Sequence, residues 1–313
     1  MVMKTLRAAR VIAIRGEGRR TYHWTSVVAP DSQQIAQLTQ RFQIYEEYFQ
    51  DVQDLDERPR LEKEANNTLV ILKVPVARSD PNSGRPSFAV IPLGIVFGRE
   101  EILTVSSEEL PLLRAIELQL PQETDELDPR WLTVEVIQRM ARAFLDALQV
   151  INGEIVHTEA RLHHSQSNDE FFSMLSLSKI LIRFTSALRG DISVLQQLLR
   201  LPIIAQDEED AEDLADALID LQQARDMTEV YTSTITNMMD AYGGVLQTNI
   251  SNTLKVITGW TVIIAIPATV ATIYGMNVPL PLQDWPYAWP VLMGGGFVVS
   301  LFAVLWFRRR HWI

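Results

Sequence analysis

The chain has 313 residues, of which 47% are hydrophobic, a formal net charge of −11 at pH 7 and no cysteine. Most single domains have roughly 100 to 200 residues, so a globular domain leaves room for a second part. The lack of cysteine excludes disulfides, thiolate nucleophiles and cysteine zinc sites, and the acidic charge argues against nucleic acid, whose phosphates it would repel.

The charge is divided unevenly. Residues 255–313 hold four basic residues against one acid, Asp284, and carry +3, which leaves −14 for residues 1–254. An acidic N-terminal part favours cationic partners or simply solubility. The apolar run Val11 to Ile14 is too short for the core of a secretory signal, so we expect this part to stay in the cytoplasm.

Short segments that suit β-strands dominate residues 1–106, bounded by Pro, Gly, Asn and Ser clusters. They predict strands at Val11 to Arg15, Thr21 to Val28, Thr68 to Val76, Phe88 to Phe97 and Glu101 to Val105. Asp31 or Ser32 can cap a helix that runs to about Phe49. This mixture predicts an α/β domain over residues 1–125 without fixing its strand order.

Residues 126–254 are predicted to be helical. Pro129 suits the first turn of a helix that continues to about His163, and Asn168 can cap a second helix that ends near Pro202. A third helix is predicted from about 207 to 275, continuous with the first membrane span described below.

The third helix carries an uncharged seam at heptad spacing, which needs a partner helix along its length. Its positions are Leu214, Ala217, Leu221, Ala224, Thr228, Tyr231, Ile235, Met238, Tyr242, Val245, Asn249, Asn252 and Val256. The partner is either the preceding helices of the same chain or other copies of this helix. Gly243 and Gly244 are the weak point, because each costs about 1 kcal/mol relative to alanine inside a helix.

Two uncharged apolar runs near the C-terminus, Val256 to Tyr274 and Trp289 to Phe307, each have about the length that crosses a membrane as a helix. Lys255 precedes the first run and Arg308 to Arg310 follow the second, which predicts that both outer flanks are cytoplasmic. The predicted membrane domain is residues 255–313, with spans at about 256–275 and 289–307 and an outer loop at 276–288.

The tetrapeptide Tyr274-Gly275-Met276-Asn277 directly follows the first span. Its sequence and position resemble the signature of the CorA magnesium-transporter family. Further matches are DLDERPRLE at 54–62, VPV at 74–76, the following IPLGIVFG and LKVIT at 254–258, so the resemblance covers nearly the whole chain. The resemblance implies a homopentamer that closes when intracellular magnesium binds to it. In each subunit, a long stalk helix joins a cytoplasmic α/β domain to two membrane helices.

Two spans cannot enclose a pore, so ion passage requires an oligomer. A ring of Asn277 amides, with Gly275 and Met276, is the predicted selectivity filter, because magnesium gives up its water reluctantly and is better captured with its water shell. The resemblance favours a pore lined by Leu254, Ile257, Thr261, Ala265, Thr269 and Ile273, with a cytoplasmic constriction at Leu254 and Ile257. The membrane potential would drive the ion, and no organic cofactor is expected.

Asp216 falls where the family has its interface magnesium ligand, although the surrounding acidic run also suits a solvated face. We predict that Asp216→Ala makes the channel less sensitive to intracellular magnesium. The chain departs from the family pattern in its outer loop, where Asp284 is the only acid, and at Ser251, where many members have asparagine. Asp284 is therefore the candidate for attracting cations at the mouth.

Three alternatives remain at this stage. His157, His163 and His164 suggest a zinc site, and zinc, cobalt or nickel can be the transported ion, although Met276 favours magnesium by the same resemblance. The chain could also be a membrane-tethered sensor or scaffold without flux. An enzyme is not expected, because no HExxH, GxSxG or glycine-rich nucleotide motif is present.

Overall fold

The computed structural model describes residues 9–15, 21–64, 67–79, 84–97, 101–119, 129–162, 168–201, 208–282, 285–310 and 312. The chain forms two compact units, Met1–Asn237 and Met238–Ile313. The first contains a sheet with helices on both faces, and the second contains the predicted spans.

The sheet of the first unit has six strands. They are β1 (Ala9–Arg15), β2 (Thr21–Val28), β3 (Arg60–Glu64), β4 (Asn67–Ser79), β5 (Pro86–Phe97) and β6 (Glu101–Ser106). Their spatial order is β1-β2-β6-β5-β4-β3, with β2 and β6 parallel and the other neighbours antiparallel. Strands β4 and β5 lie inside the sheet. Their central runs, 69–76 and 91–97, are buried on both faces, as continuous apolar runs in interior strands should be.

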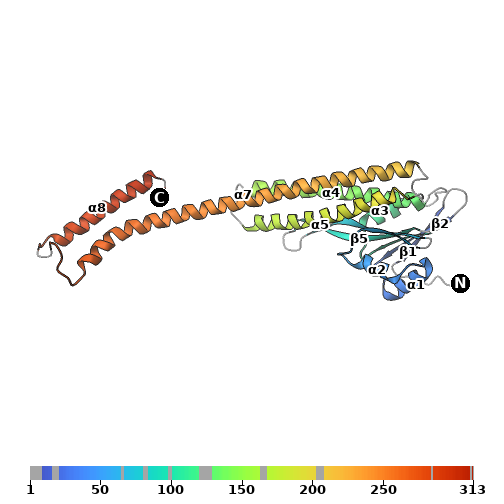
Figure 1. Cartoon of the computed structure of the whole chain (residues 1–313), viewed down its shortest axis with the longest axis horizontal. Coiled ribbons are helices and arrows are strands. Elements are labelled where there is room, and N and C mark those ends of the chain that lie inside the picture. Colours follow the sequence, from blue (N-terminus) through green and yellow to red (C-terminus); the bar gives the residue numbers. More distant parts are fainter. Residues whose placement is uncertain are drawn as a thin grey trace. The chain divides into compact units, whose positions relative to one another are not determined.

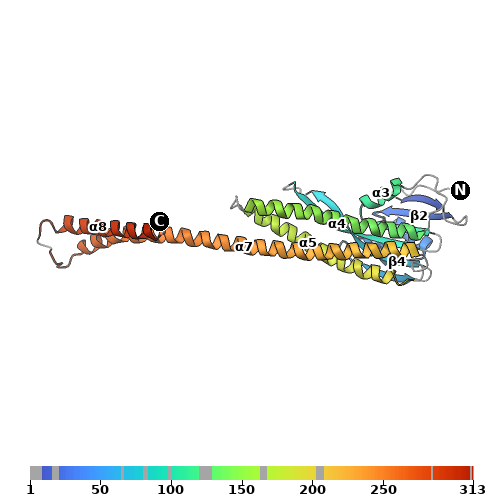
Figure 2. The same cartoon turned by 90° about the horizontal axis from the view of Figure 1, so that it is seen from above.

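Helices cover both faces of this sheet (Figures 1 and 2). Helices α1 (Ser32–Phe42) and α2 (Glu46–Gln53) pack on one face, where Phe49 and Val52 meet Ile71 and Leu103 in the core. Helices α3 (Pro111–Gln119), α4 (Pro129–Leu162) and α5 (Asn168–Leu198) lie on the other. There the rings of Phe88 and Phe144 pack edge-on against that of Phe184 in α5, at 6.0 and 5.2 Å between centroids.

The predicted strands and the predicted long helices are present with ends shifted by a few residues. The prediction of one helix from about Asp31 to Phe49 is wrong. Asp31 does cap α1, since its carboxylate accepts from the N–H of Gln34 at 2.8 Å. Gln43 then takes a left-handed conformation with φ 54°, which ends α1, and α2 begins at Glu46. Strand β3 was not predicted because its sequence RLEKE is mostly charged, as suits the edge of a sheet.

The heptad seam lies on α7 (Glu208–Tyr274), which continues through Gly243 and Gly244 without a break. Its first five positions are almost fully buried: Leu214, Ala217, Leu221, Ala224 and Thr228. Both views place this part of α7 beside α4 and α5 (Figures 1 and 2). Ile235 and Tyr242 are also buried, whereas the later positions Val245 and Asn252 are exposed. The preceding helices are therefore the partner of the first part of the seam only.

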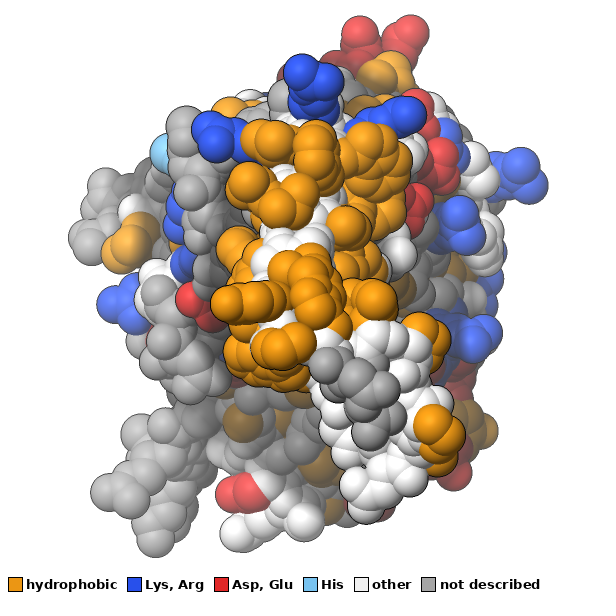
Figure 3. All heavy atoms as spheres, turned by 90° about the vertical axis from the view of Figure 1, so that its left-hand side faces the viewer, with side chains coloured by type: hydrophobic (Ala, Val, Ile, Leu, Met, Phe, Trp, Pro, Cys, Tyr) orange, Lys and Arg blue, Asp and Glu red, His pale blue; other side chains and the backbone are white. Residues whose placement is uncertain are grey.

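The second unit contains the end of α7 and α8 (Ala288–Arg309), both long and apolar enough to cross a membrane. Figure 3 shows hydrophobic side chains gathered on this end of the molecule. The exposed apolar residues of the two helices include Trp260, Ile264, Leu301 and Phe302, all at least half exposed. The segment Asp169–Leu198 also meets the length and composition of a span. Several of its apolar side chains, among them Leu181, Phe184 and Leu188, are however fully buried in the first unit.

Two glycines of the first unit give a matched test of this packing. A Cβ added at Gly190 in α5 would meet the Pro59 ring at 2.6 Å, whereas one at Gly153 in α4 meets nothing within 4 Å. We predict that Gly190→Ala lowers the stability of the full chain by about 1 to 3 kcal/mol through overpacking. Gly153→Ala should raise it by up to about 1 kcal/mol. Thermal unfolding of the detergent-solubilised variants measures both, and equal effects would contradict the close contact at Pro59.

Candidate functional site

The GMN sequence, Gly275 to Asn277, lies directly after the end of α7. The N–H of Gly275 donates to the carbonyl oxygens of Ala271 at 3.0 Å and Thr272 at 3.2 Å, which closes the last turn. The hydroxyl of Tyr274 donates to the carbonyl oxygen of Pro281 at 2.8 Å and ties the turn to the following loop. Asn277 thus follows the negative end of a helix dipole, where a cation is favoured.

The side chain of Asn277 is exposed, and it makes no hydrogen bond to any of the residues that the structure describes. Its amide oxygen is therefore free to accept from water or from the hydration shell of an ion. A Cβ at Gly275 would come no closer than 3.4 Å to the carbonyl oxygen of Ala271, an ordinary contact. The contacts within the single chain therefore do not require glycine at this position.

The six predicted pore-lining residues are all exposed: Leu254, Ile257, Thr261, Ala265, Thr269 and Ile273. Helix α8 covers the side of α7 that includes Ile263 and Pro267. This side lies about half a turn around the helix axis from the row of predicted pore-lining residues. The hydroxyls of Thr261 and Thr269 donate to carbonyls of their own helix at 2.8 Å. The row is thus uncharged, its hydroxyls have acceptors, and α8 leaves it uncovered.

Asp216 lies in the first unit, exposed at the rim of a cavity of about 340 Å³. Asp213, Asp220 and Arg142 line the same cavity. Carboxylate oxygens suit magnesium, yet the described part of the chain contains no group of three acidic or histidine side chains placed to hold a metal. A metal at Asp216 would therefore need further ligands from another chain or from water.

Two predicted sites cannot be located. Asp284 lies outside the described residues, as do His163 and His164. His157 is on α4, and the described residues give it no metal-binding cluster.

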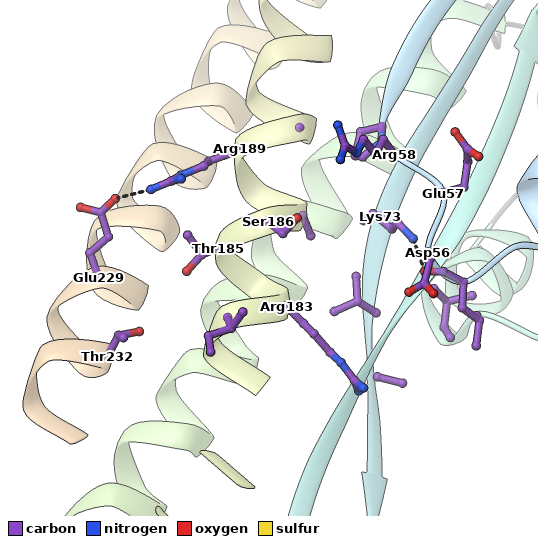
Figure 4. Close-up of a pocket in the computed structure, with 18 of the residues that line it drawn as sticks. Asp56, Glu57, Arg58, Lys73, Arg183, Thr185, Ser186, Arg189, Glu229 and Thr232 are labelled. Carbon is purple, nitrogen blue, oxygen red and sulfur yellow. Dashed lines mark hydrogen bonds and ion pairs between the residues drawn. The ribbon is translucent and has the colours of Figure 1, made fainter. Parts of the chain in front are cut away.

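A larger cavity of about 1260 Å³ lies between the sheet, α5 and α7 within the first unit (Figure 4). Its lining includes four basic side chains, Arg58, Lys73, Arg183 and Arg189, and three acids, Asp56, Glu57 and Glu229. Arg189 pairs with Glu229 at 3.7 Å, and the Lys73 ammonium donates to the carbonyl oxygen of Leu55 at 2.6 Å. Burial lowers the pKa of Lys73. This excess of basic groups disfavours a divalent cation.

Sequence reasoning missed the contact between the two membrane helices. Pro267 and Gly296 pack together, and Ser300 hydrogen-bonds to the backbone of Ile263. Pro267 inside an apolar run was a visible signal, because proline leaves a helix carbonyl without a donor. The donor for that carbonyl, Ser300, lies 37 residues after Ile263 in the sequence and can be recognised only once the two helices are paired.

An α/β domain joined by a long helix to two helices able to span a membrane defines the class of this protein. The sequence profile of the family described as CorA-like Mg2+ transporter protein matches residues 20–309. The chain therefore belongs to the CorA family of membrane transporters.

Similar proteins agree with this assignment. The chain is 26% identical over 295 residues to the cobalt/magnesium transport protein CorA of Methanocaldococcus jannaschii, covering 93% of this chain and 91% of that protein. The complete structure of the CorA magnesium transporter from the same organism superposes with a TM-score of 0.79 and 25% identity, over 99% of this chain and 100% of that one. The full-length CmaX protein, at 14% identity and a TM-score of 0.68, covers 96% of this chain and 91% of its own, and shows a shared fold alone.

Proposed function

We propose that the chain forms a homopentameric channel that passes hydrated magnesium ions along an axis lined by α7. The observation that carries this proposal is the exposed, uncharged row on α7 that ends at Asn277, opposite the side covered by α8. Lipid offers the amide of Asn277 no hydrogen-bond partner. Copies of the same row around a shared axis would enclose water, which can bond to the amide. The magnesium and cobalt transport named for the relative from Methanocaldococcus jannaschii is consistent with this.

In the proposed filter, the Asn277 amides accept hydrogen bonds from the water shell of the ion. Because magnesium keeps its water shell, little dehydration energy is required. The C-terminal carbonyl groups of the surrounding helices add an electrostatic field that favours a cation. Gly275 allows the helices to approach where the ring forms. The membrane potential supplies roughly 2.3 kcal/mol per charge per 100 mV, and therefore about twice that for a divalent ion.

The proposed gate is at the cytoplasmic end of the row, where rings of Leu254 and Ile257 can exclude water. Both side chains are more than half exposed in the single chain. Lys255 and Arg308 to Arg310 favour a position of both termini on the cytoplasmic side of the cell's inner membrane. We assign Asp284 to the outer mouth, as the one acid of the loop between the spans.

Closure by intracellular magnesium is proposed to act through Asp216. Asp213, Asp216 and Asp220 are spaced so that they share one side of α7. Where such sides of two chains meet, the carboxylates repel, and a divalent ion between them would stabilise the closed packing. Arg142 lines the same cavity. When the ion leaves, the positive charge of Arg142 would replace part of the attraction that the ion exerts on these carboxylates.

Replacing Asn277 tests the filter. We predict that Asn277→Ala reduces magnesium uptake into liposomes by at least tenfold at an unchanged oligomer mass, because the apolar methyl cannot accept a hydrogen bond from the hydrated ion. Val278→Ala is the control, as it changes the neighbouring exposed residue, and should retain uptake. Uptake that survives in Asn277→Ala would contradict a filter at Asn277, whereas a wild type that takes up no magnesium would favour the tethered sensor or scaffold. Parallel assays with cobalt, nickel and zinc identify the preferred ion.

Replacing Asp216 tests regulation. We predict that Asp216→Ala shifts the internal magnesium concentration that half-inhibits uptake upward by about tenfold, equivalent to roughly 1.4 kcal/mol of lost ion binding. Asp146→Ala removes the same charge from an exposed position on α4 and should leave inhibition unchanged. Equal inhibition of the Asp216→Ala variant and the wild type would rule out this residue as a regulatory ligand.

A further inference from the structure

Pro267 breaks the hydrogen-bond pattern of α7 inside the membrane span. In an α-helix the carbonyl of residue i accepts from the N–H of residue i+4, and a proline at i+4 has no N–H. The carbonyl oxygen of Ile263 therefore lacks its backbone donor. Inside a bilayer no water is available to replace it, so the group needs another partner from the protein.

Helix α8 supplies that partner. The hydroxyl of Ser300 donates to the carbonyl oxygen of Ile263 at 3.1 Å, and both residues are less than a tenth exposed. The hydroxyls of Thr261, Thr269 and Thr272 on α7 instead donate to carbonyls of their own helix. Ser300 differs from these because its hydroxyl reaches across to the one carbonyl that Pro267 leaves without an N–H donor.

A small residue, Gly296, lies one turn before Ser300 where the two helices meet. A Cβ added at Gly296 would lie 3.6 Å from both Pro267 Cα and Val270 Cγ2, an ordinary contact, so alanine would fit whereas a larger side chain would push the helices apart. A Cβ at the neighbouring Gly294 or Gly295 meets nothing within 4 Å. Gly296 and Ser300, four residues apart, thus form a docking face on α8 for the proline turn of α7.

We propose that Ser300 is a positioning residue for conduction, and that it fastens the pore helix at its proline. Prolines in helices permit bending, and the segment after Pro267 leads directly to the GMN sequence. By bonding to Ile263 while Gly296 packs on Pro267, α8 fixes the bend and with it the direction in which Asn277 is presented. This inference deepens the proposed channel function and rests on it for its effect on flux.

A double-mutant cycle tests the bond itself. Replacing Pro267 with alanine restores an N–H to residue 267, which can donate to Ile263 and makes the serine redundant. The full chain in lipid is prepared as wild type, Ser300→Ala, Pro267→Ala and the double variant, and amide hydrogen exchange is followed in residues 264–274. We predict that Ser300→Ala speeds exchange there roughly 3- to 15-fold, the range expected for one hydrogen bond between membrane helices.

In the Pro267→Ala background the same serine replacement should change exchange less than about twofold. Ser300→Thr, which keeps the hydroxyl, should behave as the wild type. An equal effect of Ser300→Ala in both backgrounds, or no effect in either, overturns the proposal. If Ser300→Ala fails to assemble, recovery in the double variant supports the bond, and failure of both overturns it.

Magnesium uptake by the same preparations tests the consequence. Ser300→Ala and Gly296→Leu should slow uptake several-fold at an unchanged oligomer mass, whereas Gly295→Leu, the matched control, should not. Normal uptake by Ser300→Ala overturns the role in conduction. If the wild type itself passes no magnesium, the proposed channel function fails, and the exchange cycle still decides whether Ser300 holds the proline turn.

Discussion

Inside a bilayer each polar group needs a partner from the protein or from enclosed water, and this constraint links the features of the second unit. The threonine hydroxyls of α7 meet it within their own helix, and Ser300 meets it for the carbonyl that Pro267 leaves without a donor. The amide of Asn277 has no such partner among the described residues. A pair of helices cannot surround water, so in the proposed assembly this amide finds its partner on an axis shared with other copies.

The two sides of the α7 span are therefore assigned different tasks. The side with Ile263 and Pro267 packs on α8 of the same chain, where Gly296 and Ser300 receive it. The opposite side is uncharged and left uncovered by α8, as a row that lines the aqueous path of the proposed channel would be. In the proposed channel α8 is more than a membrane anchor, because it would set the geometry of the helix that leads to the filter.

Much of the fold was predictable because it depends on local patterns. The apolar runs of β4 and β5, the Asp31 cap and the uncharged spans each specify their structure through neighbouring residues. The end of α1 was missed because Gln43 in a left-handed turn has no sequence signal like that of glycine, and β3 because an edge strand needs few apolar residues. At the site, the resemblance predicted Asn277 as the filter residue, which stays a prediction. The pairing of Ser300 with Ile263 depends on how two helices dock and is invisible in either helix alone.

In the proposed channel, the Asn277 side chains of several copies meet around one axis. The chain contains no cysteine, so Asn277→Cys places a single thiol at the proposed filter without further changes. Treating this variant in lipid with an oxidant or a short bis-maleimide should link neighbouring chains into covalent dimers. A cysteine at the exposed Phe302 of α8, where lipid is expected, should link far less. Equal, negligible linking of the two variants would contradict the shared axis.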